Sequence, residues 1–346
     1  MTSEQWNKLL RLRGLLALYV VLHHARNVYW PRMHALDASV TSWERGVYAF
    51  INVIGQWGLF AVLAFFVISG LSIGVAYSQS FKASRFFVAR LRRLYPALLF
   101  SILLSGALLL ARGGNIKNEV LNFFATLTFQ NEITFGSAFA ENSPYWSLAC
   151  EGWYYVFYPF LGICLFSSVG ILGLMCGAIA FSFLFYNPGS GDAVAFFSVW
   201  LMGVMLAKNV SKAMGGKQLA LALFMLFGGV LCCAFCDLKR IALYPSSVVN
   251  PLVLAASLGM GGVVLYIIQN ENRMLWRRLR NFLGNISYSL YLVHYPIMLT
   301  IASFKIWRNG VPGCISGSLV AILVSIGVAF ISWKYFEVPF MKRRSA

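Results

Sequence analysis

Long runs of apolar residues, separated by short polar and charged segments, fill this chain almost from end to end. A helix needs about 20 predominantly apolar residues to cross the hydrocarbon core of a bilayer. Read with a window of that length, the pattern predicts about ten membrane-spanning helices. They are expected at residues 10–30, 50–77, 94–111, 146–166, 168–186, 192–208, 218–236, 248–269, 284–303 and 314–336.

The polar segments between these runs differ in charge. Those on one side carry about twice as many Lys and Arg residues as those on the other. Because cytoplasmic loops are rich in positive charge, we expect loops 79–93, 208–217 and 271–280 inside, together with both termini. The longest connecting segment, 112–145, then lies outside, and its stretch Leu121–Phe129 is apolar enough for a short interfacial helix.

The composition supports the same class of protein. Hydrophobic residues make up 59% of the chain and charged residues 11%, with a mean hydropathy of +0.71, which is too apolar for a water-soluble protein of this length. The net charge of +17 could suggest nucleic acid, but the basic residues lie in short clusters between apolar runs. We therefore predict an all-α polytopic membrane protein, formed by residues 1–346 as one membrane domain without an appended soluble domain, and no nucleic-acid partner.

Cysteine and histidine usage does not favour a metal centre. The seven cysteines are an odd number and lie in or beside apolar segments, which argues against a disulfide framework. Cys233 and Cys236 have CxxC spacing, but no second pair or nearby histidine completes a site. The four histidines are scattered, so we expect no metal and interpret the cysteines as packed thiols.

Two ionisable residues interrupt the first apolar run. Arg13 and His24 are eleven residues apart, so on a helix they lie within about 20° of one stripe and roughly 16 Å apart along the axis. Ionisable groups at membrane depth are costly and normally face a protein interior or a watery cavity. The pair therefore predicts a functional site, with a cation near the cytoplasmic surface and an imidazole deeper in the bilayer.

A cluster of arginines precedes the third span. Arg85, Arg90, Arg92 and Arg93 fall within nine residues, shortly before Pro96. Such a cluster can simply anchor a loop on the cytoplasmic side. It can also bind a polyphosphate, because guanidinium groups bind phosphate oxygens bidentately. The chain has no GxxxxGK[ST] loop and no GxGxxG motif after a strand, so a phosphate-bearing ligand would have to be held by arginine side chains.

The fourth span carries a carboxylate near its start. Ser147, Glu151 and Tyr155 are spaced at i, i+4 and i+8, so they share one helix face. A buried carboxylate needs a partner, and we expect His24 at matching depth. An imidazole held by a carboxylate could act as general base on a hydroxyl. A structural role for Glu151, bonded to backbone or a tyrosine, is the alternative.

Further polar residues occur in the ninth and second spans. Tyr288, Tyr291 and His294 give the ninth span a polar patch, although a lone histidine on an apolar helix is usually a hydrogen-bonded structural residue. Ser69 and Gly70 mark a small-residue packing point in the second span. We do not interpret Ser69 as a nucleophile, because no GxSxG elbow is present.

Taken in order, several of these fragments resemble the membrane acyltransferase-3 family. The matching residues are Arg13-x10-His24, Phe65-Phe66-x2-Ser69-Gly70, Arg90-x2-Arg93-x2-Pro96, Trp146-Ser147-Leu148-x2-Glu151, Ser287-Tyr288-x2-Tyr291-Leu292-x-His294-x-Pro296 and Phe336-Glu337-x-Pro339. Each fragment alone is weak, but six in the expected order cover residues 8 to 342. One departure is His23, which stands where the family usually has an apolar or aromatic residue, so either histidine could be the catalytic one.

The resemblance implies a multi-pass enzyme of the bacterial inner membrane. Such an enzyme takes an acyl group, usually acetyl from acetyl-CoA as a co-substrate, and transfers it to a sugar hydroxyl of a surface or exported glycan. No tightly bound cofactor is implied; the partners are acetyl-CoA, a glycan or lipid-linked sugar, and membrane lipids. The catalytic residues would be Arg13, His24 and Glu151.

Phosphates of the donor would meet Arg90, Arg92 or Arg93 at the cytoplasmic mouth, with Arg13 further in. His24 would then deprotonate the acceptor hydroxyl for direct attack on the thioester, an acyl-histidine relay being the variant. The acceptor would enter from outside, near 112–145. Two other classes stay open, a secondary transporter and a non-catalytic membrane protein of polysaccharide export. A transporter would more often show an inverted repeat, which this sequence does not.

Overall fold

The computed structural model describes most of the chain, except residues 38, 78–80, 161–169, 171, 174–189, 213, 239–250, 271–276, 305–306, 308–309 and 342–346. Within the described part all regular secondary structure is helical. The helices are α1 (Ser3–Tyr29), α2 (Ser42–Gly55), α3 (Gly58–Ala76), α4 (Ala83–Ala111), α5 (Val120–Leu127), α6 (Tyr145–Phe160), α9 (Ser190–Leu206), α10 (Gly216–Leu238), α11 (Pro251–Asn270), α12 (Arg277–Ser303), α13 (Gly310–Ser332) and the short α14 (Val338–Met341). The predicted span 168–186 lies almost wholly outside the described residues.

Three stretches of the described helices are long and apolar enough to cross a membrane, namely Ser42–Ala76, Ala83–Ala111 and Gly310–Met341. Helices α1 and α12 are each 27 residues long, but charged and polar side chains interrupt their apolar sequence. The same polar side chains build the site described below. Length and composition thus agree with a membrane protein.

The structure differs from two of the predicted elements, in the division of one span and in the start of the next helix. The second predicted span, 50–77, is two helices that meet at Gln56 and Trp57. A Cβ added to Gly58 would lie only 2.5 Å from the His23 ring, so this joint packs directly against α1. The arginines expected in loop 79–93 lie instead on the first turns of α4, which begins at Ala83. Because residues 83–95 contain no glycine or proline, the helix extends well before the apolar run.

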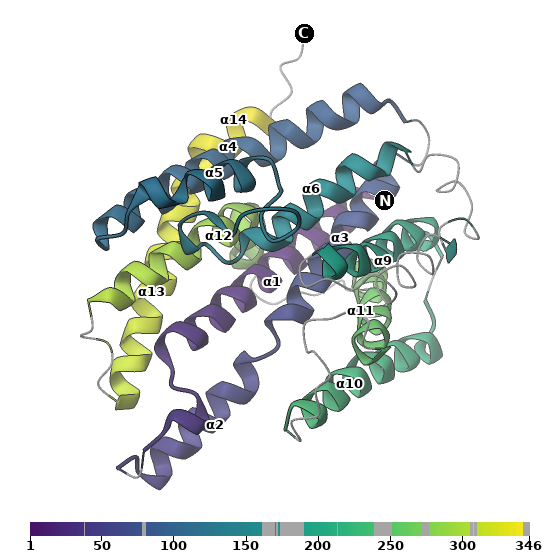
Figure 1. Ribbon diagram of the computed structural model, residues 1–346. Helices are drawn as coiled ribbons and strands as arrows, with labels where there is room; N and C mark the ends of the chain where they lie inside the picture. Colours follow the sequence, from purple (N-terminus) through teal and green to yellow (C-terminus); the bar gives the residue numbers. More distant parts are fainter. Residues whose placement is uncertain are drawn as a thin grey trace.

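Helix α1 crosses the middle of the molecule, while α10 lies at one edge (Figure 1). The start of α1 is fixed by a capping box in which Thr2 and Gln5 exchange hydrogen bonds. It approaches α12 closely, since a Cβ on Gly14 would lie 2.4 Å from the backbone nitrogen of Gly284. Such backbone contact is possible only with glycine at the crossing. It fixes the register of α1 against α12.

Helices α3 and α9 make a second close crossing. A Cβ on Gly70 would lie 2.0 Å from the carbonyl oxygen of Trp200, and one on Gly203 would lie 2.2 Å from that of Val67. Gly70 is therefore a packing point, as predicted. The crossing brings the buried Trp200 against α3 beside Ser69.

In the connecting segment 112–145, the short helix predicted at Leu121–Phe129 is confirmed as α5.

Candidate active site

A pair of histidines lies where α1 meets α12. Nδ1 of His24 lies 2.8 Å from Nε2 of His294, and Nδ1 of His294 lies 3.0 Å from the carbonyl oxygen of Leu290. A carbonyl oxygen can only accept, so Nδ1 of neutral His294 donates and its Nε2 accepts. His24 must then donate from Nδ1, which leaves its Nε2 as an unprotonated acceptor. This tautomer, assigned from the hydrogen-bond network, is that of a general base.

The neighbouring histidine is occupied by structural contacts. Nδ1 of His23 lies 2.5 Å from the carbonyl oxygen of Gly55, and its Nε2 lies 3.0 Å from the side-chain nitrogen of Asn27. Both ring nitrogens of His23 therefore have partners, one at the joint between α2 and α3 and the other one turn further along α1. Of the two alternatives that the sequence left open, the hydrogen bonds favour His24 as the reactive imidazole.

Glu151 does not pair with His24, contrary to the expectation from sequence. Its carboxylate accepts a hydrogen bond of 2.5 Å from Ser69 and another from the hydroxyl of Tyr155, one turn along α6. Trp200 in turn donates from its indole nitrogen to the Ser69 hydroxyl at 3.3 Å. The helices pack so that Glu151 faces Arg13 in a cavity that His24 does not line.

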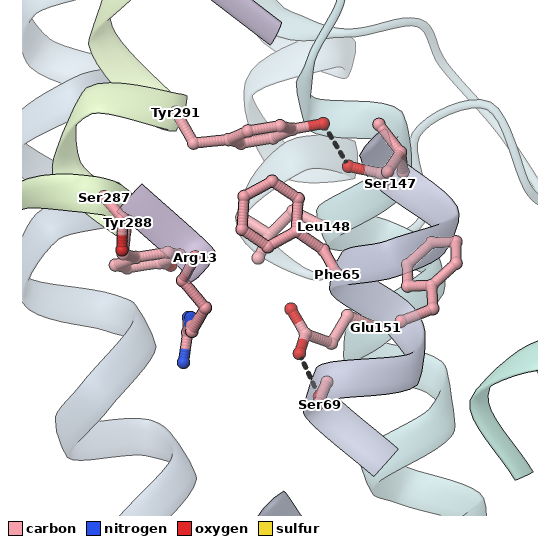
Figure 2. Close-up of a pocket in the computed structure, with 11 residues that line it drawn as sticks. Arg13, Phe65, Ser69, Ser147, Leu148, Glu151, Ser287, Tyr288 and Tyr291 are labelled. Carbon is pink, nitrogen blue, oxygen red and sulfur yellow. Dashed lines mark hydrogen bonds between the residues drawn. The ribbon is translucent and has the colours of Figure 1, made fainter. Parts of the chain in front are cut away.

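A small cavity of about 50 Å³ lies between α1, α3, α6 and α12. The guanidinium of Arg13 and the carboxylate of Glu151 face one another across it, and Ser69 lies below Glu151 (Figure 2). Arg13 is partly buried and interacts electrostatically with Glu151. The predicted sharing of one face by Ser147 and Glu151 is confirmed, since both line this cavity.

A larger cavity of about 290 Å³ continues from the small one toward the N-terminal end of α1. The two cavities share four lining residues, Arg13, Ser69, Glu151 and Tyr288. Arg90 and Arg93 line the larger cavity, while Arg92 is exposed and lines neither. The arrangement therefore separates the three candidate phosphate ligands, because Arg90 and Arg93 share one face of α4 at i, i+3 spacing and Arg92 points elsewhere.

The position of Arg90 is defined by aromatic rings. Its guanidinium carbon lies 5.6 Å from the centre of the Tyr155 ring and 5.8 Å from that of Phe86. Cation–π contacts of this kind hold a guanidinium without consuming its hydrogen-bond donors. Tyr155 thus connects Glu151 to Arg90, a role that its place on the predicted face of α6 could have suggested.

Tyr291 separates the small cavity from the histidine pair. Its hydroxyl lies 2.6 Å from the hydroxyl of Ser147, and its ring centre lies 5.9 Å from that of Phe65 and 6.1 Å from that of His294. In Figure 2 the Tyr291 ring extends over the top of the pocket toward Ser147. A ligand in the cavity that reached His24 would have to displace this contact.

Tyr288, by contrast, lines both cavities and donates to the carbonyl oxygen of Leu94 at 3.1 Å.

Sequence reasoning assigned no role to two residues near the site. Glu337 is 3% exposed and lies at the end of a π-helical turn, Trp333–Glu337, where it accepts a hydrogen bond of 3.0 Å from Ser289. It interacts electrostatically with Arg93 and Arg13, so it adds a buried negative charge behind the arginines. Its signal was a carboxylate directly after the last predicted span, in the fragment Phe336-Glu337-x-Pro339. Tyr295 contacts the His24 ring edge-on, with 4.9 Å between ring centres, and had no comparable signal.

The described residues contain no group of three or more His, Cys, Asp or Glu side chains that could hold a metal ion. The candidate site instead has a histidine pair at one end and arginines along a polar cavity at the other. Three cations, Arg13, Arg90 and Arg93, line the larger cavity with one carboxylate, Glu151. Such an excess of positive charge suits an anionic ligand.

Known proteins with related sequences include two that are provisionally named O-acetyltransferases. Nodulation protein 10 of Rhizobium leguminosarum bv. viciae is 26% identical over 97% of this chain and 93% of its own length. A Bacillus subtilis protein provisionally named a peptidoglycan O-acetyltransferase is 26% identical over 82% of this chain, and a Staphylococcus aureus protein provisionally named an O-acetyltransferase is 23% identical over 83%. The chain spans about half the length of these last two relatives, at 50% and 54%.

No solved structure matches the chain. The acyltransferase domain, as a family, matches residues 8–334, nearly the whole sequence. This range includes His24 and His294, the cavity residues Arg13, Arg90 and Arg93, and Glu151. The chain therefore belongs to the acyltransferase-3 family of membrane proteins.

Proposed function

We propose that this protein transfers an acetyl or related acyl group from acetyl-CoA to a sugar hydroxyl of a surface or exported glycan. The observation that carries the proposal is the line of polar groups from Arg90 and Arg93 to Arg13 along the two cavities, with the His24–His294 pair beyond the Ser147–Tyr291 contact. An acyl-CoA has the matching chemistry, with phosphates at one end and a thioester at the other. We place the protein in the bacterial inner membrane, as a multi-pass enzyme.

In this proposal the phosphates of the donor bind Arg90 and Arg93, and Arg13 contacts the donor where it enters the small cavity. Glu151 is not the partner of the base. It faces Arg13 across the small cavity and accepts from Tyr155, whose ring Arg90 contacts, so we assign it as a positioning residue. The thioester passes the Ser147–Tyr291 contact to reach His24, and the acceptor approaches His24 from the opposite end, near segment 112–145.

The chemical step follows from the tautomer of His24. Its Nε2 takes the proton of the sugar hydroxyl while the oxygen attacks the thioester carbon. The new C–O bond forms, the C–S bond breaks, and the CoA thiolate leaves and recovers the proton from the imidazolium. His294 stabilises that imidazolium by accepting from its Nδ1. Direct transfer needs only one base, whereas an acyl-histidine relay would need Nε2 to act as nucleophile as well.

The test is acetyl transfer in membranes that contain the protein. Radiolabelled acetyl-CoA and surface glycan fractions are incubated with membranes carrying the parent chain or His24→Ala, and label in glycan is measured. Transfer that requires both the protein and His24 supports the proposal. Equal labelling with His24→Ala contradicts the assignment of the base. Glycan acetylation that is unchanged when the protein is absent would favour the transporter or export classes instead.

A further inference from the structure

One tryptophan at the N-terminal end of α1 has no part in the mechanism above. Trp6 lines the larger cavity together with Arg90 and Arg93 of α4. It is seven residues from Arg13 and 18 residues from His24, so all three side chains fall within about 20° of one stripe of α1. Along the helix axis Trp6 lies roughly 10 Å from Arg13 and roughly 27 Å from His24. The stripe therefore presents an indole, a guanidinium and an imidazole in that order.

The indole of Trp6 has a face available to a ligand. The residue is 37% exposed, and no aromatic ring in the described part of the chain stacks on it. The capping box of Thr2 and Gln5 fixes the first turn of α1, so the ring is held at the cavity mouth by a regular helix. An interfacial anchor would be the ordinary role for a tryptophan near a helix end. An anchor faces lipid, however, whereas Trp6 shares a cavity wall with two arginines.

We propose that Trp6 forms a nucleobase subsite, in which the indole stacks on the adenine ring of the acyl-CoA donor. This inference rests on the proposed function. The donor carries its groups in the order thioester, pantetheine arm, phosphates and adenosine. The protein offers His24, the small cavity, the arginines and Trp6 in the same order. Every base has a π-face, and stacking on an aromatic side chain strengthens binding without any hydrogen-bond readout.

The subsite explains how the donor is recognised at both ends. Arginines alone would bind any phosphate-rich molecule of suitable size, because their contacts to phosphate are electrostatic. A stacking platform beyond the arginines adds a requirement for an aromatic base at a fixed distance from the phosphates. Trp6 is therefore predicted to determine specificity for full-length acyl-CoA over donors that lack adenosine.

Trp6→Ala and Trp6→Phe test this, with Trp43→Ala as matched control, because Trp43 is 67% exposed on α2 and lines neither cavity. Each variant is assayed with acetyl-CoA and with S-acetyl-phosphopantetheine, which keeps the thioester and one phosphate but lacks adenosine. We expect Trp6→Ala to raise KM for acetyl-CoA by about tenfold with a smaller change in kcat, and Trp6→Phe to retain most of the affinity. The difference between parent and Trp6→Ala should shrink with the truncated donor.

Binding of CoA itself, measured by calorimetry on protein in lipid nanodiscs, separates this inference from the proposed function. CoA binding weakened by Trp6→Ala but not by Trp43→Ala supports the subsite, even if no glycan is acetylated. Acetyl transfer that is unaffected by Trp6→Ala overturns the subsite and leaves the proposed function standing. An equal loss with both donors also overturns it, because the tryptophan would then support the helix end rather than the base.

Discussion

His294 accepts from Nδ1 of His24 through its own Nε2, at 2.8 Å, because its Nδ1 is committed to the carbonyl oxygen of Leu290. The backbone carbonyl of Leu290 on α12 thus determines which nitrogen of His24 on α1 carries the proton. His294 connects the two. This relationship, rather than a carboxylate, orients the His24 ring. His24, His294 and Leu290 act as one unit.

The first prediction concerns this histidine pair. His24→Ala should remove nearly all acetyl transfer, since general-base catalysis contributes roughly 10²- to 10⁴-fold. His294→Ala should lower kcat as well, because His24 loses the acceptor that fixes its tautomer. His23→Asn is the control, since its contacts lie at the helix joint, and it should affect stability more than kcat. A severe kcat loss in His23→Asn with a mild one in His24→Ala would reverse the assignment.

The second prediction separates the arginines of α4. Arg93→Ala and Arg90→Ala should each raise KM for acetyl-CoA by about tenfold or more, because a charge-assisted contact to phosphate is lost. Arg92→Ala removes the same charge from the same helix but leaves the cavity wall intact, so KM should stay near that of the parent. Steady-state kinetics on reconstituted protein gives the answer. If all three variants behave alike, the cluster acts through net charge or topology and not as a phosphate site.

The third prediction concerns Glu337. Glu337→Gln leaves the size of the side chain unchanged but removes a buried negative charge that balances Arg93 and Arg13. We expect a lower melting temperature of the protein in detergent, and a smaller difference from the parent when CoA is present, because its phosphates supply the missing negative charge.

Glu141→Gln is the surface control for Glu337. Glu141 pairs with Arg112 at 2.8 Å, but its side chain is 61% exposed. An exposed ion pair contributes little to stability, about 0–1 kcal/mol. Comparable melting temperatures for the two variants, or no effect of CoA on Glu337→Gln, would show that Glu337 does not balance the cavity charge.

The fourth prediction tests the crossing of α3 and α9. Gly70→Ala places a Cβ against the backbone of Trp200, so the helices must separate, at a cost of about 1–3 kcal/mol. Ser69 and Trp200 would move with them, and kcat/KM should fall too. Gly228→Ala in α10 is the matched change, since nothing lies within 4 Å of the added Cβ. It should be neutral or stabilising. Equal stability of the two variants would mean that the crossing tolerates the methyl group.

The fifth prediction concerns sidedness. On a background without the natural cysteines, Ser42→Cys and Ser137→Cys should react with an impermeant thiol reagent added to intact cells, while Ser84→Cys should react only after permeabilisation. All three serines are exposed, so access depends on the membrane alone. The reverse pattern would place the arginine cavity outside and remove its access to cytoplasmic acyl-CoA.

Much of the site could be located from sequence because helical periodicity is local. The stripe of Arg13 and His24 and the shared face of Ser147 and Glu151 follow from the rise and twist of one helix, whatever surrounds it. Both are present in the structure. The cluster containing Arg90 and Arg93 was also identified, although its helix begins earlier than the apolar run suggested.

What the sequence by itself determined was the class of protein and the faces of individual helices. The tertiary structure decided which faces meet, and at what depth. Glu151 is hydrogen-bonded to Ser69 instead of His24, and His294, which the sequence favoured as a structural residue, is the hydrogen-bond partner of His24. Relative depth depends on close backbone crossings such as Gly14 with Gly284, where neighbouring helices are locked in register. No local pattern encodes that register, because it depends on residues hundreds of positions apart.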